Sequence, residues 1–235
     1  MLKGTSFLKV VMSKQSRGDK GEKLVSSLLE GIKEYKYILN DVTFLNKKSE
    51  MTHQIDHILI HPYGVFVIET KNYYGKISVP KDAPFWIKEV NGEQIKISNP
   101  LKQNKSHAIT IGRILKGEYN VIPVVVFVQN NAPYLGDENV INLDDLLLFI
   151  ESYPYKHKYQ KKTLDEINKK ISKKVSKVTK EEHIENISYL KQIKKEIKDE
   201  ISYAVENNLC PRCGSKMLSK GYAYCCSKCT FNFKL

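Results

Sequence analysis

Residues 54–72, QIDHILIHPYGVFVIETKN, decide the fold of this 235-residue chain. Two runs of branched apolar residues flank a His-Pro-Tyr-Gly turn, and this pattern predicts a buried β-hairpin with strands near 54–60 and 64–71. Charged residues interrupt the pattern, because Asp56 lies in the first strand and Glu69 and Lys71 close the second. A hairpin that enters a core has to compensate these charges.

The turn fixes the register of the hairpin and therefore decides which side chains are neighbours. With the turn centred on Pro62-Tyr63, Asp56 lies opposite Glu69, and opposed residues share a face with Cβ atoms about 4.5–5.5 Å apart. Lys71 follows Glu69 by two positions, so it projects to the same face. The sequence therefore predicts two adjacent carboxylates with an ammonium group beside them.

Two adjacent carboxylates repel each other and need compensation when they are buried. A divalent cation such as Mg²⁺ or Mn²⁺ compensates them directly, because one or two carboxylates commonly hold such an ion. A structural ion pair at the end of the sheet is the alternative; it explains Lys71 and one carboxylate but leaves the second without a partner. Spacing alone leaves both interpretations open.

The flanking segments complete a mixed α/β pattern. Residues 17–34 and 101–116 carry apolar positions at helical spacing, and residues 35–45 are typical of a strand. The run VIPVVVFV predicts a central strand that is covered on both faces. FWIKEV and EQIKI flank Asn91-Gly92, which predicts a second hairpin with a type I′ turn. This order of elements favours a mixed sheet with helices on it.

Taken together, these elements resemble a known nuclease core. Asp56 on one strand and Glu69-x-Lys71 on the next look like the PD-(D/E)xK nuclease core, with Glu22 on the preceding helix and Gln103 on the following one. More closely, the chain resembles the NERD (nuclease-related) domain family over about residues 17–128. The matching segments, in family order, are GDKGEKLVSSLL, QIDHILIHPYGVFVIETKNYYGKI, Trp86, NPLKQN and VVVF.

The resemblance implies a restriction-endonuclease-like fold and Mg²⁺-dependent hydrolysis of DNA. At the matching positions it implies that Asp56 and Glu69 are metal ligands and that Lys71 is the catalytic lysine. It also implies that Glu22 is an accessory acid and Gln103 an orienting polar group. The chain departs from the PD-(D/E)xK pattern at Ile55, which stands where that pattern has a proline before the aspartate.

Three histidines in the same region invite a zinc interpretation. His53, His57 and His61 recur every four residues. On a regular strand they share the face opposite Asp56 and are too widely separated to hold one ion. We therefore expect surface or core histidines.

Composition and charge point to a polyanionic partner. The formal net charge is +12, and the last 26 residues carry five basic residues and no acidic one. No apolar run approaches the roughly 20 residues that span a bilayer, and the start of the chain lacks the cleavage site of a signal peptide. We expect a cytoplasmic protein with DNA, rather than a membrane, as its partner.

The C-terminal cysteines predict a zinc ribbon. Two Cys-x-x-Cys pairs separated by twelve residues deliver four thiolates to one tetrahedral Zn²⁺, and Gly214 permits a tight turn after the first pair. A fifth cysteine, Cys225, is an alternative ligand to its neighbour, although the repeated spacing favours the latter. A disulfide-bonded unit would need an oxidising compartment. The predicted ligands are Cys210, Cys213, Cys226 and Cys229.

This segment resembles the C-terminal four-cysteine ribbons of bacterial type IA topoisomerases, which bind single-stranded DNA. Nothing in the chain resembles the catalytic domain of those enzymes. Basic groups interleaved with aromatic side chains suit single strands, although the aromatic residues could equally form the small core of the ribbon. The candidate nucleic-acid-binding residues are Arg212, Lys216, Lys220, Tyr222, Tyr224 and Lys228.

Between these parts, residues 154–208 predict a lysine-rich helical arm. Thr163 with Glu166 and Thr179 with Glu182 have the form of capping boxes, and each precedes isoleucines three or four residues apart. A solvated spacer is one interpretation of the arm, and a coiled coil that forms a homodimer is another.

The sequence thus predicts four parts: an N-terminal extension (1–16), a nuclease-like domain (17–153), the helical arm (154–208) and the zinc ribbon (209–235). The preferred function is metal-dependent cleavage of DNA in processing, repair or defence. The alternatives are a non-catalytic DNA-binding protein and a protein-docking module.

Overall fold

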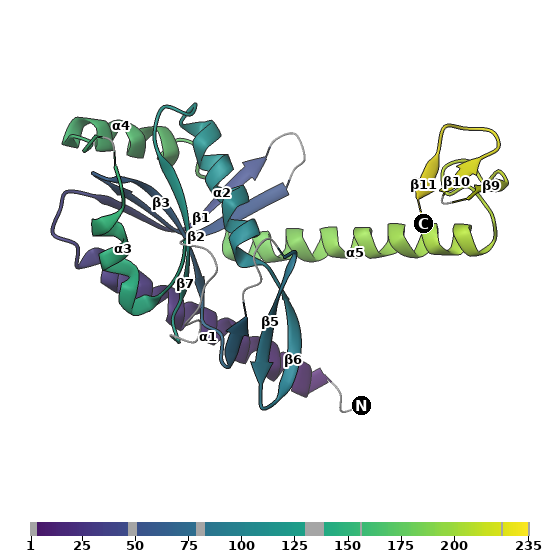
Figure 1. The fold of residues 1–235 in the computed structure, drawn as a ribbon, viewed down its shortest axis with the longest axis horizontal. Helices are drawn as coiled ribbons and strands as arrows, with labels where there is room; N and C mark the ends of the chain where they lie inside the picture. The colour runs from purple at the N-terminus through teal and green to yellow at the C-terminus, as the bar shows by residue number, and fades with distance from the viewer. Residues whose placement is uncertain are drawn as a thin grey trace. The chain divides into compact units, whose positions relative to one another are not determined.

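The computed structural model describes residues 4–46, 51–78, 83–129, 139–155, 157–221 and 223–234. The chain forms two compact units, Met1–Val178 and Thr179–Leu235 (Figure 1). Each unit contains at least one β-sheet of its own.

A five-stranded mixed sheet is the centre of the first unit. The antiparallel strands β1, β2 and β3 are followed across the sheet by β7 and β8, which run parallel to β3. The mixed α/β class predicted from the sequence is therefore confirmed. The strands are β1 (Tyr37–Asn46), β2 (Met51–His61), β3 (Gly64–Lys71), β7 (Val121–Phe127) and β8 (Val140–Asn142).

Helices cover both faces of this sheet (Figure 1). Alternation along β3 decides which side chains meet which helix: Phe66 and Ile68 pack towards α1 and α3, whereas Val65 and Val67 pack towards α2 and α4. Within the described residues, none of the helices has the length and apolar character needed to cross a membrane. The helices are α1 (Gly4–Glu30), α2 (Pro100–Ile114), a single 3₁₀ turn η1 (Leu143–Asp145), α3 (Leu146–Ser152) and α4 (Lys161–Ser172).

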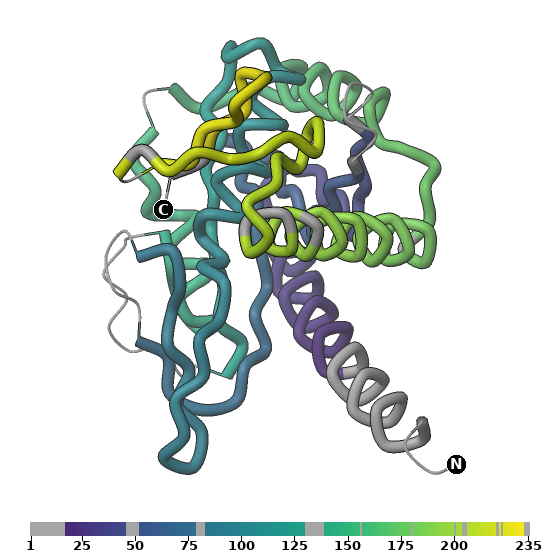
Figure 2. The backbone as a smooth tube through the Cα atoms, turned by 90° about the vertical axis from the view of Figure 1, so that its right-hand side faces the viewer, coloured from purple at the N-terminus to yellow at the C-terminus, as the bar shows by residue number. Residues whose placement is uncertain are grey.

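A second, three-stranded sheet is inserted between β3 and α2, and Figure 2 shows its strands extending beside the main sheet. Asn91 and Gly92 both have positive φ angles, 52° and 83°, which confirms the predicted type I′ turn. Trp86 anchors this sheet, because its buried ring stacks on Phe127 of β7 with the centroids 6.1 Å apart. The strands are β4 (Lys76–Ser78), β5 (Phe85–Val90) and β6 (Glu93–Ser98).

Two segments differ from the sequence-based predictions. Helix α1 already begins at Gly4, so the boundary expected after residue 16 lies inside a continuous helix. The capping box predicted at Thr163 is wrong, because α4 begins at Lys161 with Gln160 as its N-cap. The apolar side of α4, Leu164, Ile167 and Ile171, is buried against the sheet of the first unit. The residues expected to form one helical arm are therefore divided between the two units.

The second unit consists of α5 (Lys180–Glu206) and a small three-stranded sheet. The capping box at its start is confirmed, since Thr179 Oγ1 accepts the Glu182 backbone N–H at 3.2 Å and Glu182 accepts the Thr179 backbone N–H at 2.7 Å. The strands are β9 (Met217–Lys220), β10 (Ala223–Cys226) and β11 (Asn232–Lys234).

A buried asparagine attaches α2 to the centre of the main sheet. The helix begins where Asn99 Oδ1 accepts the backbone N–H groups of Leu101 and Lys102. One turn later, the fully buried Asn104 donates from Nδ2 to the carbonyls of Val67 and Val124, both at 2.8 Å. Because these carbonyls belong to β3 and β7, one side chain joins the helix to two strands.

Replacement of Asn104 by leucine should therefore destabilise the first unit. Two buried carbonyls would then be without their donor, and we expect a decrease of about 1–2 kcal/mol in the free energy of unfolding. Urea unfolding followed by circular dichroism measures this decrease. Lys102→Leu, on an exposed position of the same helix, is the control and should change stability by less than about 0.5 kcal/mol. Equal stability of the two variants would contradict the role given to Asn104.

Candidate active site and metal centre

The strands β2 and β3 separate where the predicted acidic residues begin. Their pairing has the register expected from the turn, but the paired region ends at His57 and Ile68. Beyond this pair, β2 continues beside β1 and β3 continues beside β7. Asp56 lies at the separation point, which we call the fork, and its Oδ2 accepts the Thr70 backbone N–H at 2.8 Å. A side-chain carboxylate therefore takes a backbone donor where the two strands part.

An irregularity in β1 and β2 lies at the same level. The pairing of these strands skips Asp41, which has a φ of 51°, and its counterpart Asp56. On β2, Ile55 and Ile58 belong to the same core cluster although a regular strand would place them on opposite faces. Leu39 and Val42 on β1 show the same switch. On both strands, the alternation of the side chains that enter this core cluster therefore shifts by one position at the level of Asp41 and Asp56.

This switch corrects one prediction about the histidines. His53 does not share a face with His57 and His61, because the irregularity turns it towards α2, where its ring lies 6.0 Å from that of His107. His57 and His61 are buried, and burial lowers the pKa of each to about 4. His57 pairs through Nδ1 with Asn40 Oδ1 at 2.8 Å. These two are core histidines, as expected.

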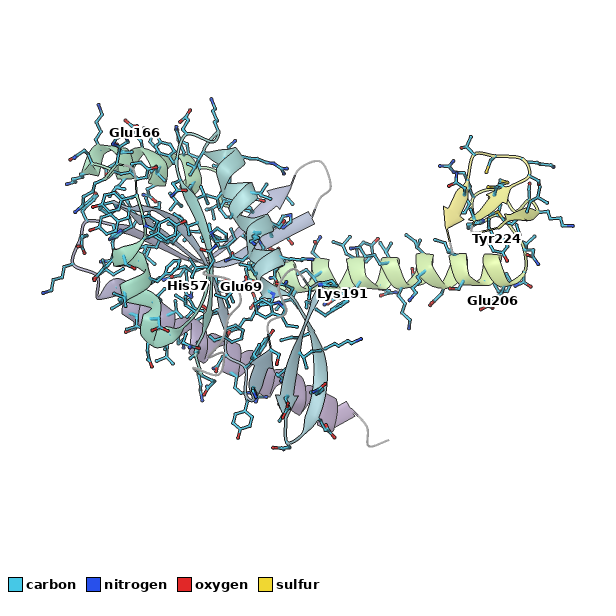
Figure 3. All side chains as sticks on the ribbon, in the orientation of Figure 1. His57, Glu69, Glu166, Lys191, Glu206 and Tyr224 are labelled. Atoms are coloured by element: carbon cyan, nitrogen blue, oxygen red, sulfur yellow. The ribbon has the colours of Figure 1, made fainter. Side chains whose placement is uncertain are left out.

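Glu69 and Lys71 end β3 on the face that carries α2. The Glu69 side chain, labelled in Figure 3, is only 4% exposed, and the Lys71 ammonium donates to its Oε1. Glu69 Oε2 lies 3.9 Å from Nε2 of His107, which is buried on α2. The carboxylate of Glu69 is thus held between a strand lysine and a helix histidine.

The close spacing of charged side chains at the fork changes the pKa values of Asp56 and Lys71. Burial, with the nearby Glu69 carboxylate and the more distant Glu22, raises the pKa of Asp56 to about 8. The Lys71 ammonium and the Thr70 N–H act in the opposite direction but do not cancel the rise. Although burial disfavours its charged form, the Glu69 carboxylate raises the pKa of Lys71 above its ordinary value. Without a further positive charge, the fork therefore favours the neutral form of Asp56 near neutral pH.

Helix α1 brings Glu22 to the fork by a close approach at Gly21. A Cβ atom at Gly21 would lie 3.0 Å from Asn72 Cβ and 3.4 Å from Thr70 Cγ2, so only glycine lets the helix lie this near the end of β3. Asn72 also donates from Nδ2 to the Arg17 carbonyl at 2.7 Å. The Glu22 carboxylate contributes in a small way to the raised pKa of Asp56.

Helix α2 contributes a different set of residues from the one the sequence suggested. Gln103 is exposed and precedes His107 by one helical turn, which places both on the same side of the helix. Sequence reasoning missed His107 and Asn104, which are buried beside the strands. The sequence contained a signal for their burial, because both residues continue the three- and four-residue spacing that joins the apolar positions Leu101 and Ile111.

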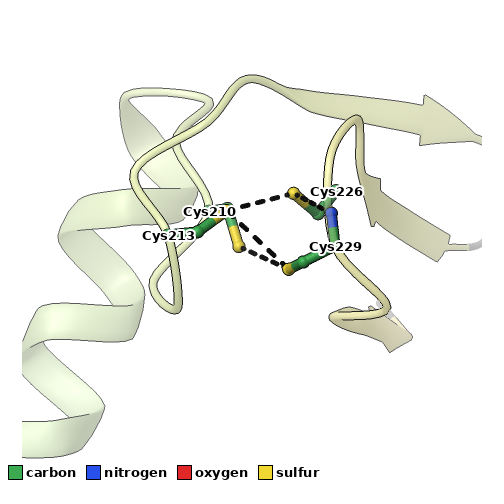
Figure 4. Close-up of side chains that lie close together, drawn as sticks. All are labelled: Cys210, Cys213, Cys226 and Cys229. Carbon is green, nitrogen blue, oxygen red and sulfur yellow. Dashed lines mark hydrogen bonds between the residues drawn. The ribbon is translucent and has the colours of Figure 1, made fainter.

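The four predicted cysteines converge in the second unit (Figure 4). Their sulfur atoms all lie within 4.8 Å of one another, and the measured pairs are 3.5–3.7 Å apart. A tetrahedral Zn²⁺ with Zn–S bonds of about 2.3 Å requires sulfurs about 3.8 Å apart, so the cluster fits this ion. Among the residues that the structure describes, it is the one cluster in which three or more His, Cys, Asp or Glu side chains could hold a metal ion.

Short turns and hydrogen bonds determine the positions of the cysteine thiols and affect the pKa values of three of them. The Gly214 N–H donates to the Cys210 carbonyl at 2.8 Å, and Gly214 has the positive φ, 68°, that such a turn requires. Hydrogen bonds from Ser215 lower the pKa of Cys213 to about 6, and the Lys228 N–H lowers that of Cys226. Although the Phe231 N–H favours its thiolate, burial and the surrounding sulfurs raise the pKa of Cys229 to about 12. A metal ion bound by the four sulfurs would favour the thiolate form of all four cysteines.

The other residues predicted to act in the ribbon lie outside the four-cysteine cluster. Cys225 lies on β10 between Leu218 and Asn232 and does not belong to the cluster, which therefore uses Cys226. Tyr224 is half-buried in the same strand, so part of its surface belongs to the ribbon itself. Tyr222 and the Lys220 side chain lie outside the described residues. The remaining candidates, Arg212, Lys216 and Lys228, are exposed.

Comparison with known proteins identifies the first unit. Residues 17–128 match the family model described as the nuclease-related domain. The chain belongs to this family. An uncharacterized protein of Bacillus anthracis is 33% identical over 144 residues, which cover 58% of this chain and 67% of that protein. No solved structure matches the chain. The nuclease-related domain includes the fork, Glu22 and Gln103, whereas the four cysteines lie outside the matched residues.

The four-cysteine cluster predicts which thiols hold zinc. Cys226→Ser should lower the zinc content from one ion per chain to none and unfold the ribbon, because metal binding supplies the folding energy of so small a sheet. Cys225→Ser, a change of the neighbouring residue, should leave the zinc content and the ribbon intact. Zinc is measured by plasma mass spectrometry after dialysis, and the ribbon by amide resonances. Loss of zinc in Cys225→Ser alone would contradict the assignment.

Proposed function

We propose that this protein is a metal-dependent nuclease that hydrolyses phosphodiester bonds of DNA in processing, repair or defence. The observation that carries the proposal is the fork, where Asp56, Glu69 and Lys71 lie together at the end of two buried, paired strands. The nuclease-related domain that contains the fork supports it. The α/β order and the position of the acids are consistent with a PD-(D/E)xK-like core.

The donor set at the fork fits a divalent cation better than a structural ion pair. Lys71 engages Glu69, and yet the pKa of Asp56 remains raised to about 8. With the ion pair alone, Asp56 would carry a proton near neutral pH, whereas a divalent ion would offset the charges of both carboxylates. Two carboxylates suffice for Mg²⁺ or Mn²⁺, because water and substrate phosphate complete the octahedron.

Each residue of the fork then has a distinct role. Asp56 and Glu69 would hold the metal ion, which when bound polarises a phosphodiester oxygen and makes hydroxide available near neutral pH. The Lys71 ammonium, kept charged by Glu69, stabilises negative charge that develops on the phosphoryl oxygens or orients the attacking water. Glu22 adds an acid from α1, and the exposed Gln103 orients the water or phosphate from α2.

The zinc ribbon would supply DNA affinity apart from the catalytic unit. Exposed basic side chains without acidic neighbours in the sequence favour a polyanion, and the partly exposed Tyr224 offers an aromatic surface to bases of a single strand. A ribbon that folds around four thiolates is suited to a reducing compartment, so we place the protein in the cytoplasm. A homodimer through α5 is a separate part of the proposal, and sedimentation of the full-length protein tests it.

Cleavage assays with Lys71→Ala test the proposed chemistry. With Mg²⁺ or Mn²⁺, the wild-type protein should cleave DNA, and Lys71→Ala should lower the rate by about 100-fold or more because the positive charge at the reacting phosphate is removed. Circular, linear and single-stranded DNA are compared, with a chelator as the metal-free reference. Lys76→Ala, an exposed lysine on β4, should retain full activity. Equal cleavage by wild type and Lys71→Ala would refute the role of Lys71.

Asp56→Asn separates catalysis from mere binding in the same assay. This variant should lose Mn²⁺ binding, measured by electron paramagnetic resonance, and lose cleavage. Its thermal stability without metal should not fall, because the amide keeps an acceptor for Thr70 and removes a repelled carboxylate. A wild-type protein that binds DNA and metal but does not cleave would instead be the non-catalytic DNA-binding protein. A protein that binds neither would favour the docking module.

Charge removal on the ribbon tests its part in DNA binding. Lys216→Gln combined with Lys228→Gln should weaken affinity for single-stranded DNA by about fivefold and reduce its salt dependence, because two phosphates are no longer neutralised by the protein. Lys191→Gln with Lys194→Gln removes the same charge from exposed positions of α5 and is the control. Fluorescence anisotropy at several salt concentrations gives both quantities. Identical affinity of the two double variants would count against a DNA-binding ribbon.

A further inference from the structure

A pocket of about 450 Å³ opens in the first unit. It lies between the end of β1, the start of β2, the last turns of α2 and the segment that follows α4. Phe44, Ile114 and Val175 form apolar parts of its wall, and Thr110 and Ser176 add hydroxyl groups. Its volume lies within the range of about 300–1,000 Å³ that is usual for sites that hold small organic groups.

The wall that follows α4 is fixed by backbone hydrogen bonds. The Lys174 N–H donates to the Ile171 carbonyl at 2.8 Å, and the Ser176 N–H donates to the Thr43 carbonyl of β1 at 2.7 Å. Ser176 Oγ also accepts the Val178 N–H at 3.2 Å. The segment is thereby attached to both α4 and the main sheet, so the fold itself holds this wall of the pocket.

Positive charge gathers at this pocket. Arg113, Lys173 and Lys174 line it, and no acidic residue does so among the described residues. Arg113 lies in the last turn of α2, and the two lysines follow the end of α4, where the helix dipole favours a cation. Favourable interaction with the helix dipoles explains how these cations could benefit stability. The pocket also combines the three cations with an apolar wall and hydroxyl groups, and such a combination suits a phosphate that carries an organic group.

A series of side-chain contacts joins the pocket to the catalytic acids. His53 lines the pocket, and its ring meets that of His107 edge to face at a centroid distance of 6.0 Å. His107 in turn lies 3.9 Å from Glu69. A strand whose scissile phosphate lies at the fork therefore has a basic pocket in the same unit, two side-chain contacts away from Glu69.

We propose that this pocket binds a nucleotide of the DNA strand that flanks the scissile phosphate. Lys173, Lys174 and Arg113 would contact the phosphate, and Phe44, Ile114 and Val175 would contact the sugar or base. The pocket would thereby position the substrate and favour strands with an unpaired nucleotide at this place. The inference rests on the proposed nuclease function and adds a substrate subsite to it.

Two full-length variants test the subsite without touching the catalytic residues. Lys173→Gln with Lys174→Gln should weaken the binding of a short fluorescein-labelled single strand by about fivefold or more. It should also lower the salt slope by about 0.7 for each phosphate that the protein no longer neutralises. Binding is measured by anisotropy in a chelator, so that no cleavage occurs. Thr110→Trp fills the pocket without changing the charge and should weaken binding to a similar extent.

The controls distinguish the pocket from general electrostatics. Lys33→Gln with Lys162→Gln removes the same charge from exposed positions outside the pocket and should keep affinity within about twofold of wild type. Circular dichroism and thermal melting confirm that each variant is folded. If Lys173→Gln with Lys174→Gln only lowers stability, the lysines merely complement the helix dipoles and the inference is overturned. An affinity that falls with charge but not with Thr110→Trp also overturns it.

Cleavage by the same proteins shows which proposal fails. If wild type cleaves DNA and the pocket variants bind and cleave like the control pair, the subsite is refuted and the nuclease function stands. If wild type neither binds nor cleaves DNA, both are refuted. Cleavage that is slower in the pocket variants at low DNA concentration, and restored at high concentration, is the expected result for a subsite that contributes binding.

Discussion

Asp56 accepts a backbone hydrogen bond from Thr70 at the point where the pairing of β2 and β3 ends, and the candidate site is arranged around this hydrogen bond. The paired region of the hairpin holds the two strands in one register up to His57 and Ile68. Beyond it, β2 stays paired with β1 and β3 with β7, but β2 and β3 no longer pair with each other. The Asp56 carboxylate accepts the Thr70 N–H there in place of a backbone carbonyl. The fork is thus a structural feature of the sheet as well as a candidate site.

The surrounding core supports a charge distribution that is unfavourable by itself. Asp56 and Glu69 repel each other at a largely buried position, and Lys71 compensates only part of this repulsion. Apolar side chains on both faces of β3 keep the strand in place, and Asn104 attaches α2 to it. Such local strain is expected where a site is preorganised for a ligand, because the ligand supplies the compensation.

Local patterns were sufficient for several features of the chain. The hairpin register, the type I′ turn at Asn91-Gly92 and the capping box at Thr179 follow from residues close in sequence, and the structure confirms them. The capping box at Thr163 failed, because tertiary packing of α4 on the sheet sets the start of that helix at Lys161. The spacing of His107 indicates a buried position on the helix, but it does not identify Glu69 as the acid that the histidine meets.

The sequence by itself determined the hairpin with its two acids and lysine, and the spacing that brings four cysteines to one metal, because turns and short loops fix the geometry of neighbouring residues. Only the tertiary structure decided which face His53 occupies, how near α1 comes to the fork at Gly21, and that a basic pocket forms in the same unit. These features arise between segments far apart in the chain. Their geometry depends on packing and on one strand irregularity, and no local pattern encodes either.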